Sequence, residues 1–139
     1  MKFIVDAMLG RLAKWLRLLG YDTIYNKMLN DDELINIAKN ENRILLTRDE
    51  FLFKKAIKSN VSAKLISSTD FMIALKELNL PLDESIIGSR CTICNAILVE
   101  EKTNIWKCPN CGKLYWQGKH WKDINRRIKL LKGDNNVNS

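Results

Sequence analysis

Four cysteines stand in two pairs in the second half of the 139-residue chain and offer the donor set of a metal site. Each pair encloses two residues, and thirteen residues separate the pairs. A Cys-x-x-Cys turn, called a knuckle below, lets both of its thiolates reach one ion. Two knuckles complete a tetrahedral ligand set with no open position. The spacing therefore predicts a structural zinc site. Its ligands are Cys91, Cys94, Cys108 and Cys111.

Two disulfides and an iron site are the alternatives for this spacing. Disulfides need an oxidising compartment, whereas residues 1–6 lack the start of a signal peptide, so we expect a cytoplasmic protein. Iron would suit the second knuckle, residues 108–112, but a single site in a basic protein favours zinc. No apolar run approaches the roughly 18 residues of a membrane span, so we expect no membrane segment.

Three aspartates occupy equivalent places in the first part of the chain. Asp6 and Asp49 each lie at the end of an apolar, β-branched run, and Asp31 begins the helix expected after another. In an open parallel sheet the ligand crevice lies outside the carboxyl ends of the strands, so these side chains should share one cleft. Neighbouring carboxylates repel, and a divalent cation is the simplest partner that offsets the repulsion. The pattern predicts catalytic Mg²⁺ or Mn²⁺, which keeps water ligands for hydrolysis.

Each acid also has a purely structural interpretation. Asp31 or its neighbour Asp32 could be only a helix cap, and Asp6 and Asp49 could be turn residues. Asp70 is equally a cap or a fourth acid of the site. What favours a site is that three acids share the same topological position.

The apolar pattern of residues 1–84 alternates between strands and helices. Short β-branched runs and helical periodicities follow one another in the order βαβαβαβα. This order predicts an α/β fold, a parallel sheet flanked by helices and joined by right-handed crossovers. The expected strands are residues 2–5, 21–25, 43–47 and 61–66, and the expected helices begin near residues 9, 31, 50 and 70.

The pattern changes after residue 82. Two strand-like runs, residues 96–99 and 104–107, accompany the knuckles, as in a zinc ribbon, and Gly88-Ser89 is the natural hinge before them. Residues 121–131 have helical spacing among basic side chains. We expect three parts: the α/β domain at residues 1–84, the ribbon with a basic C-terminal helix at 85–132, and a disordered tail at 133–139.

Positive charge is concentrated in the second half of the chain. Residues 1–89 carry 13 Lys and Arg against 12 Asp and Glu, whereas residues 90–139 carry 10 against 4. A basic metal module most often meets a polyanion, so a nucleic acid is the expected partner, with a merely solubilising surface as the alternative. The candidate contacts are Arg11, Lys14 and Arg17 on the first helix, Arg48, and Lys119, Trp121, Lys122, Arg126 and Arg127.

Some of these side chains have two possible roles. Arg48 could pair with a neighbouring acid or contact a phosphate. Tyr115, Trp116 and Trp121 either stack on bases or cover the small ribbon against the first domain. The sequence leaves both pairs of roles open.

Several longer motifs resemble one known family. Residues 8–17 read MLGRLAKWLR, residues 43–49 read RILLTRD, and residues 115–121 read YWQGKHW. They resemble the PIN-like ribonuclease domain named for the C-terminal region of the Mut-seven exonuclease, and the resemblance spans residues 2–131. It implies a PIN-like fold that cleaves RNA with metal ions held by aspartates, here Asp6, Asp31 and Asp49. The usual fourth acid has no secure counterpart, Asp70 being the candidate.

The leading hypothesis is a Mg²⁺- or Mn²⁺-dependent ribonuclease whose zinc ribbon aids RNA binding. Two alternatives stay open, a non-catalytic RNA-binding or adaptor module and a toxin-like PIN nuclease that needs an antitoxin. Retention of all three acids counts against a non-catalytic RNA-binding or adaptor module. The appended ribbon is not expected of a toxin-like PIN nuclease.

Overall fold

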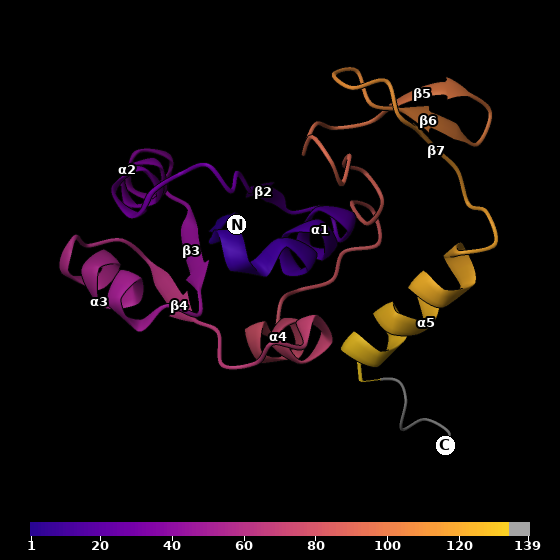
Figure 1. Cartoon of the computed structure of the whole chain (residues 1–139). Helices are drawn as coiled ribbons and strands as arrows, with labels where there is room; N and C mark the ends of the chain where they lie inside the picture. Colours follow the sequence, from indigo (N-terminus) through magenta and orange to yellow (C-terminus); the bar gives the residue numbers. More distant parts are fainter. Residues whose placement is uncertain (134–139) are drawn as a thin grey trace.

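A four-stranded parallel sheet forms the centre of the computed structural model, which describes residues 1–133 (Figure 1). The strand order is β2-β1-β3-β4, and every neighbouring pair is parallel. The predicted α/β class is confirmed, although three of the strands are shorter than expected. The strands are β1 (Lys2–Val5), β2 (Asp22–Ile24), β3 (Ile44–Thr47) and β4 (Ala63–Leu65).

Helices cover both faces of this sheet. Phe3 and Val5 of β1 are buried in a cluster with α1 and α4, while Ile4 is buried in a second cluster with α2 and α3. Successive side chains of a strand point to opposite faces, so one apolar strand supplies both cores. The helices are α1 (Gly10–Leu18), which follows the 3-10 turn η1 (Ala7–Leu9), α2 (Asp31–Glu41), α3 (Glu50–Lys58) and α4 (Phe71–Leu78).

Side-chain caps fix where three of the helices begin. At α2 the Asn30 side chain accepts a hydrogen bond from Glu33 N (2.8 Å), and the Glu33 carboxylate accepts one from Asn30 N (3.0 Å), which is a capping box. Asp49 and Asp70 cap α3 and α4 by accepting bonds from amides of the first turn. The cap of α2 is therefore Asn30, and Asp31 is the first helical residue.

The second half of the chain adds a small antiparallel sheet and a last helix. The strand expected at residues 96–99 begins three residues later, because Cys91 N donates to Ala96 O (2.8 Å) and the first knuckle uses that backbone. Ile97 makes only an isolated bridge with Arg90. The elements are β5 (Val99–Lys102), β6 (Ile105–Lys107), β7 (Leu114–Tyr115) and α5 (Trp121–Leu131), the helix having its predicted bounds.

Helix α5 packs against the first half of the chain and lies beside α4 (Figure 1). Its Ile128 is buried in the cluster of α1 and α4, with Ile124 and Leu131 packed against the same cluster. The sequence groups this helix with the ribbon, and in the structure its apolar face packs into the core of the α/β unit. Of the tail expected at residues 133–139, all but Gly133 lies outside the described residues.

One buried arginine fastens the first knuckle to the α/β unit. Arg17 Nε donates to Thr23 O (2.9 Å), and Arg17 Nη1 donates to Thr92 O (3.1 Å) and Ile93 O (3.0 Å). The side chain is only 7% exposed. Arg17 is thus no part of an exposed basic stripe with Arg11, which corrects our assignment of it to an RNA-binding surface.

Asn95 and Gly88 complete this junction between the two halves. Asn95 Nδ2 donates to Asp22 Oδ1 (2.8 Å), and Thr23 N donates to Asn95 Oδ1 (2.9 Å). Gly88 N donates to Leu18 O (2.8 Å), so the segment expected to be a hinge is bonded to α1. The ribbon is positioned by polar contacts on both sides of its first knuckle.

Replacing Arg17 by alanine should destabilise the protein, because three carbonyl oxygens of the junction lose their donor. We expect the free energy of unfolding to fall by about 2–3 kcal/mol, as for hydrogen bonds to charged groups. Chemical denaturation measures this loss. Lys14→Ala, which truncates an exposed side chain on the same helix, is the matched control, and equal stability of the two variants would contradict the role given to Arg17.

Candidate functional site

Two of the predicted acids lie close together because their strands are neighbours. β1 pairs with β3 in parallel register, with Val5 opposite Leu46, and Asp6 N donates to Leu46 O (2.9 Å). Asp6 directly follows β1, and Asp49 follows β3 after one intervening residue. Both side chains therefore lie at the carboxyl edge of the sheet, where ligands bind in folds of this class.

Thr47, the last residue of β3, links the two acids. Its hydroxyl donates to Asp6 Oδ2 (2.8 Å) and accepts a hydrogen bond from Asp49 N (2.9 Å). The side chain is fully buried. Sequence reasoning missed this residue, since the only signal was its place before Arg48-Asp49, and threonines at strand ends are common. The structure shows that Thr47 orients the Asp6 carboxylate.

Backbone amides hold both carboxylates through their Oδ1 atoms. Asp6 Oδ1 accepts from Ala7 N (2.7 Å), and Asp49 Oδ1 accepts from Phe51 N (2.8 Å) and Leu52 N (3.3 Å). The turn and cap interpretations therefore describe real bonds, but those bonds use one oxygen of each acid. Within residues 1–133, Asp49 Oδ2 accepts no hydrogen bond.

Electrostatics connect Asp31 to the other two acids. Partial desolvation, followed by the charges of Asp49 and Asp6, raises the pKa of Asp31 above its usual range, although Lys55 acts in the opposite direction. Burial and nearby like charges both disfavour the ionised form of a carboxyl group. Asp31 therefore belongs to the same acidic cluster.

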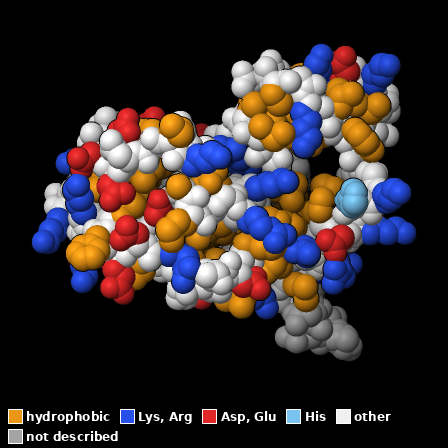
Figure 2. Space-filling view, in the orientation of Figure 1, with side chains coloured by type: hydrophobic (Ala, Val, Ile, Leu, Met, Phe, Trp, Pro, Cys, Tyr) orange, Lys and Arg blue, Asp and Glu red, His pale blue; other side chains and the backbone are white. Residues whose placement is uncertain are grey.

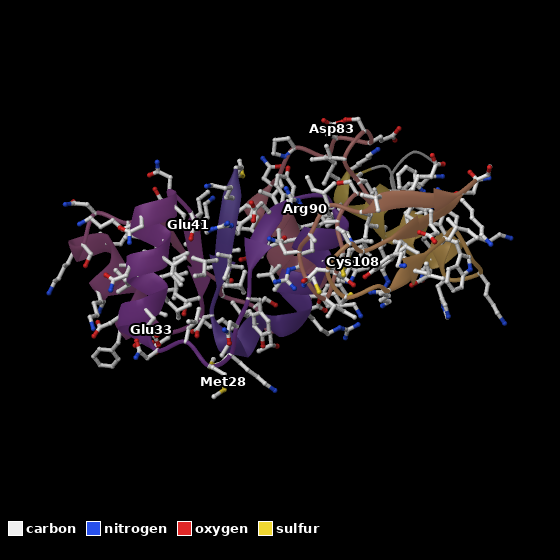
Figure 3. All side chains as sticks on the ribbon, turned by 90° about the horizontal axis from the view of Figure 1, so that it is seen from above. Met28, Glu33, Glu41, Asp83, Arg90 and Cys108 are labelled. Carbon is white, nitrogen blue, oxygen red and sulfur yellow. The ribbon has the colours of Figure 1, made fainter. Side chains whose placement is uncertain are left out.

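The other acidic candidates have separate partners. Asp32 pairs with Lys55 of α3 at 2.5 Å, and Glu33 is the second half of the capping box. Figure 3 labels Glu33 at one end of α2 and Glu41 at the other, so the acidic first turn and the helix end are well separated. Asp70 caps α4.

The carboxylates are spaced more loosely than the ligands of a bound ion. Within residues 1–133, only the four cysteines form a group of His, Cys, Asp or Glu ligand atoms lying within 4.8 Å of one another. The acids still offer what a hard divalent cation takes, anionic oxygen donors with unrelieved repulsion between them. The donor set of Asp6, Asp31 and Asp49 is chemically suited to Mg²⁺ or Mn²⁺.

Three of the predicted basic contacts lie on α1 or directly after β3. The Arg11 guanidinium lies 4.3 Å from the centre of the Phe71 ring, and Lys14 is exposed on the same helix. Arg48 Nε is buried and has no hydrogen-bond partner within residues 1–133, and Arg48 takes part in none of the ion pairs found there. Of the two roles left open for Arg48, pairing with an acid is therefore not observed.

On α5, two of the predicted contacts are already engaged. Arg126 and Arg127 both pair with Asp123, and Arg127 also lies over the rings of Trp15 (6.0 Å) and Phe71 (5.5 Å). Figure 2 shows Lys and Arg side chains gathered across the middle of this face, while Asp and Glu gather mainly over α2 and α3. Of the remaining candidates, Lys119 and Lys122 are exposed and Trp121 is half-buried.

The four cysteines form a second candidate site. Their sulfur atoms lie within 4.8 Å of one another, and none is in a disulfide. Cys94 N donates to Cys91 Sγ (3.3 Å), and Cys111 N donates to Cys108 Sγ (3.4 Å), so both knuckles fold around their sulfurs. The arrangement is that of a zinc ribbon, and the cluster could hold a zinc ion.

Hydrogen bonds favour ionisation of one of these thiols. Burial alone would raise the pKa of Cys91, but the Tyr115 hydroxyl at 3.1 Å and the amides of Cys94 and Ile93 lower it to about 6. The thiolate is the form that binds zinc. Tyr115 therefore supports the metal site from inside the ribbon, which agrees with a structural role for this aromatic residue.

The fold and the two sites define an α/β domain with an acidic carboxyl edge, joined to a module of the zinc-ribbon type. The sequence matches the family described as Mut7-C RNAse domain over residues 1–128, and the chain belongs to that family. Membership supports a ribonuclease-type hydrolase with RNA as its substrate. No curated protein and no solved structure gives a significant match. No helix within residues 1–133 is long and apolar enough to cross a membrane.

Thr47→Val should impair cleavage of RNA far more than it impairs folding. The variant keeps the side-chain shape but removes the hydroxyl that orients Asp6, and small misplacements of reacting groups cost up to about 100-fold in rate. We expect RNA cleavage to fall about 10- to 100-fold, as measured by gel assay, with Thr47→Ser retaining activity. Thr23→Val is the control, because that buried hydroxyl donates to Tyr21 O away from the acids. Equal activity of the two valine variants would exclude a positioning role.

Cys94→Ser should remove the metal from the ribbon. A module of this size has too little core to fold unaided, so loss of one thiolate should both lower metal content and unfold the ribbon while the α/β unit persists. Elemental analysis should find about one zinc ion per chain in the wild type and in the knuckle control Ile93→Ala, whose side chain is exposed. Metal-free wild-type protein with an ordered ribbon would rule out structural zinc.

Proposed function

We propose that the protein is a Mg²⁺- or Mn²⁺-dependent ribonuclease that hydrolyses RNA phosphodiester bonds at Asp6, Asp31 and Asp49. The observation that carries this proposal is the placement of Asp6 and Asp49 at the carboxyl edge of the sheet, where Thr47 links them. Partial desolvation and the charges of Asp49 and Asp6 also raise the pKa of Asp31. Acidic residues at the carboxyl edge of a parallel sheet, one of them with a perturbed pKa, are typical of functional sites. A non-catalytic RNA-binding module would have no use for this acidic cluster.

Each acid has a distinct part in this proposal. Asp6 and Asp49 would hold the principal ion, since Thr47 and backbone amides fix their orientation. When bound, such a cation would lower the pKa of an attacking water and neutralise charge on the scissile phosphate. Asp31, on the first turn of α2, would hold a second ion or orient the water.

The cations near the acids are suited to the RNA backbone. Arg48 has no protein partner for its buried Nε within the described residues, and Arg11 and Lys14 lie along α1. Lysine and arginine attract RNA chiefly through release of counterions, so these contacts would be salt-sensitive and independent of sequence. We propose that the ribbon and α5 extend this surface through Lys119, Trp121, Lys122, Arg126 and Arg127.

The four free thiols are also relevant to the cellular compartment in which the protein acts. Zinc thiolate sites are maintained where thiols stay reduced. We therefore propose that the protein acts in the cytoplasm.

Asp6→Asn and Asp49→Asn should each abolish most cleavage. Asparagine can still serve as a helix cap, so the fold should survive, while the loss of an anionic metal ligand should lower RNA cleavage by at least about 100-fold. The measurement is cleavage of labelled RNA with Mg²⁺ or Mn²⁺, with and without EDTA. Asp83→Asn, at an exposed turn outside the acidic cluster, is the matched control. EDTA-resistant, near-wild-type cleavage by either site variant would disprove the mechanism.

A further inference from the structure

A cavity of about 700 Å³ opens between the ribbon and the rest of the molecule. Its volume lies within the range of roughly 300 to 1,000 Å³ that ligand pockets occupy. Four of its lining residues are large aromatics from three separate segments: Trp106, Tyr115, Trp116 and Trp121. Figure 3 shows Arg90, which also lines the cavity, well apart from Glu33 in the first turn of α2. The cavity is thus distinct from the acidic cluster.

Two of these aromatics are not needed to hold the ribbon together. The ribbon's own core consists of Cys91, Leu98 and Cys108, with Tyr115 among the residues packed against it. Trp106 and Trp116 are absent from that core and are 42% and 64% exposed. Covering the ribbon therefore explains Tyr115 but leaves the two indoles without a structural role within the described residues.

The indole of Trp116 is held in place by a glycine. A Cβ atom added at Gly118 would lie 2.9 Å from Trp116 Nε1, closer than such atoms normally approach. The ring thus lies directly against the backbone at residue 118, and an added Cβ there would displace it. Trp121 lies beside Gly88, where an added Cβ would meet its ring at 3.5 Å, an ordinary van der Waals distance.

The chemistry of the cavity selects one class of occupant. Exposed indoles offer flat apolar faces, and Asn104 and Gln117 offer hydrogen-bond donors and acceptors at the wall. Positive charge lies beside them, since Arg90 lines the cavity and the exposed Lys119 and Lys122 are within two residues of the lining residue Trp121. An apolar peptide would cover the aromatic faces but would not neutralise the positive charge beside them. A base attached to a phosphate chain satisfies both, because bases stack on aromatic side chains while lysine and arginine neutralise the backbone.

We propose that this cavity binds an unpaired nucleobase of single-stranded RNA, stacked on Trp116, at a distance from the scissile phosphate. The inference rests on the proposed function for the identity of the ligand as RNA. A base held there anchors a long strand to the ribbon while another part of the strand lies at the acidic edge. Substrates too short to span both sites gain nothing from the cavity.

The test compares two labelled oligomers of equal length, a single-stranded oligoribonucleotide of mixed sequence and an abasic ribose-phosphate chain. Full-length protein is titrated by fluorescence anisotropy without added Mg²⁺ or Mn²⁺ and without chelator, so that zinc remains and RNA is not cleaved. Trp116→Ala should weaken binding of the base-bearing RNA about 5- to 100-fold and leave the abasic chain unaffected. Gly118→Ala, which displaces the indole without removing it, should likewise weaken binding of the base-bearing RNA and leave binding of the abasic chain unchanged.

Ile57→Ala, which truncates an exposed side chain on α3, is the control and should change neither affinity. Zinc content and unfolding midpoints establish that the Trp116 and Gly118 variants fold. Unchanged affinity of Trp116→Ala for base-bearing RNA overturns the proposal and leaves the cavity to a polypeptide partner. An equal loss for both oligomers overturns it as well, because the contact is then to the backbone.

The base site and the nuclease can fail separately. Base-dependent binding by a wild-type protein that never cleaves RNA would disprove the proposed nuclease and retain the cavity. In the opposite case, the wild type cleaves long RNA in a metal-dependent way and Trp116→Ala changes neither cleavage nor binding. That result would disprove the base site and retain the nuclease.

Discussion

The parallel pairing of β1 with β3 is the constraint on which the acidic site depends. It brings Thr47 to within a hydrogen bond of Asp6, 41 positions away in the chain. Holding carboxylates together costs electrostatic free energy, and the burial of β1 and β3 between two layers of helices offsets that cost. The hydroxyl of Thr47 and the capping amides then orient the acids. Because Asp6 and Asp49 lie within two residues of the ends of these strands, their positions are set by the sheet without a ligand.

Arg17 shows where a sequence pattern gives the wrong surface. Arg11, Lys14 and Arg17 recur every three residues, which suggests one basic stripe. An α-helix turns about 100° per residue, so each interval of three falls about 60° short of a full turn and Arg17 lies about 120° from Arg11. That rotation takes Arg17 from the solvent face to the junction, where carbonyls of β2 and of the knuckle satisfy its guanidinium. Tertiary contacts decided the role of this arginine, and the sequence contained no local sign of them.

Features set by local patterns could be predicted, and features set by long-range contacts could not. Alternation of apolar runs predicted the sheet, the cysteine spacing predicted the thiol cluster, and helical spacing predicted α5. The cap of α2 is also a local pattern, because Asn30 and Glu33 have the spacing of a capping box, although we left Asp31 and Asp32 open as caps. The ribbon strand at residues 99–102 was misplaced, because the knuckle turn competes for the same backbone. Thr47 was missed because its importance depends on a neighbour from another strand.

In the ribbon, a cluster of thiols allows aromatic side chains to stay exposed instead of forming the core. A small module without metal would have to bury its indoles to fold, since apolar area is its main source of stability. Here four thiols within 4.8 Å of one another, with Leu98 beside them, form the interior, and Arg17 and Asn95 fix the module to the α/β unit. With stability supplied by thiolate chemistry and polar junction contacts, the indole of Trp116 can remain at the surface. For the base site that we propose, ribbon stability and recognition would therefore be coupled, because the same module carries the thiol cluster and Trp116.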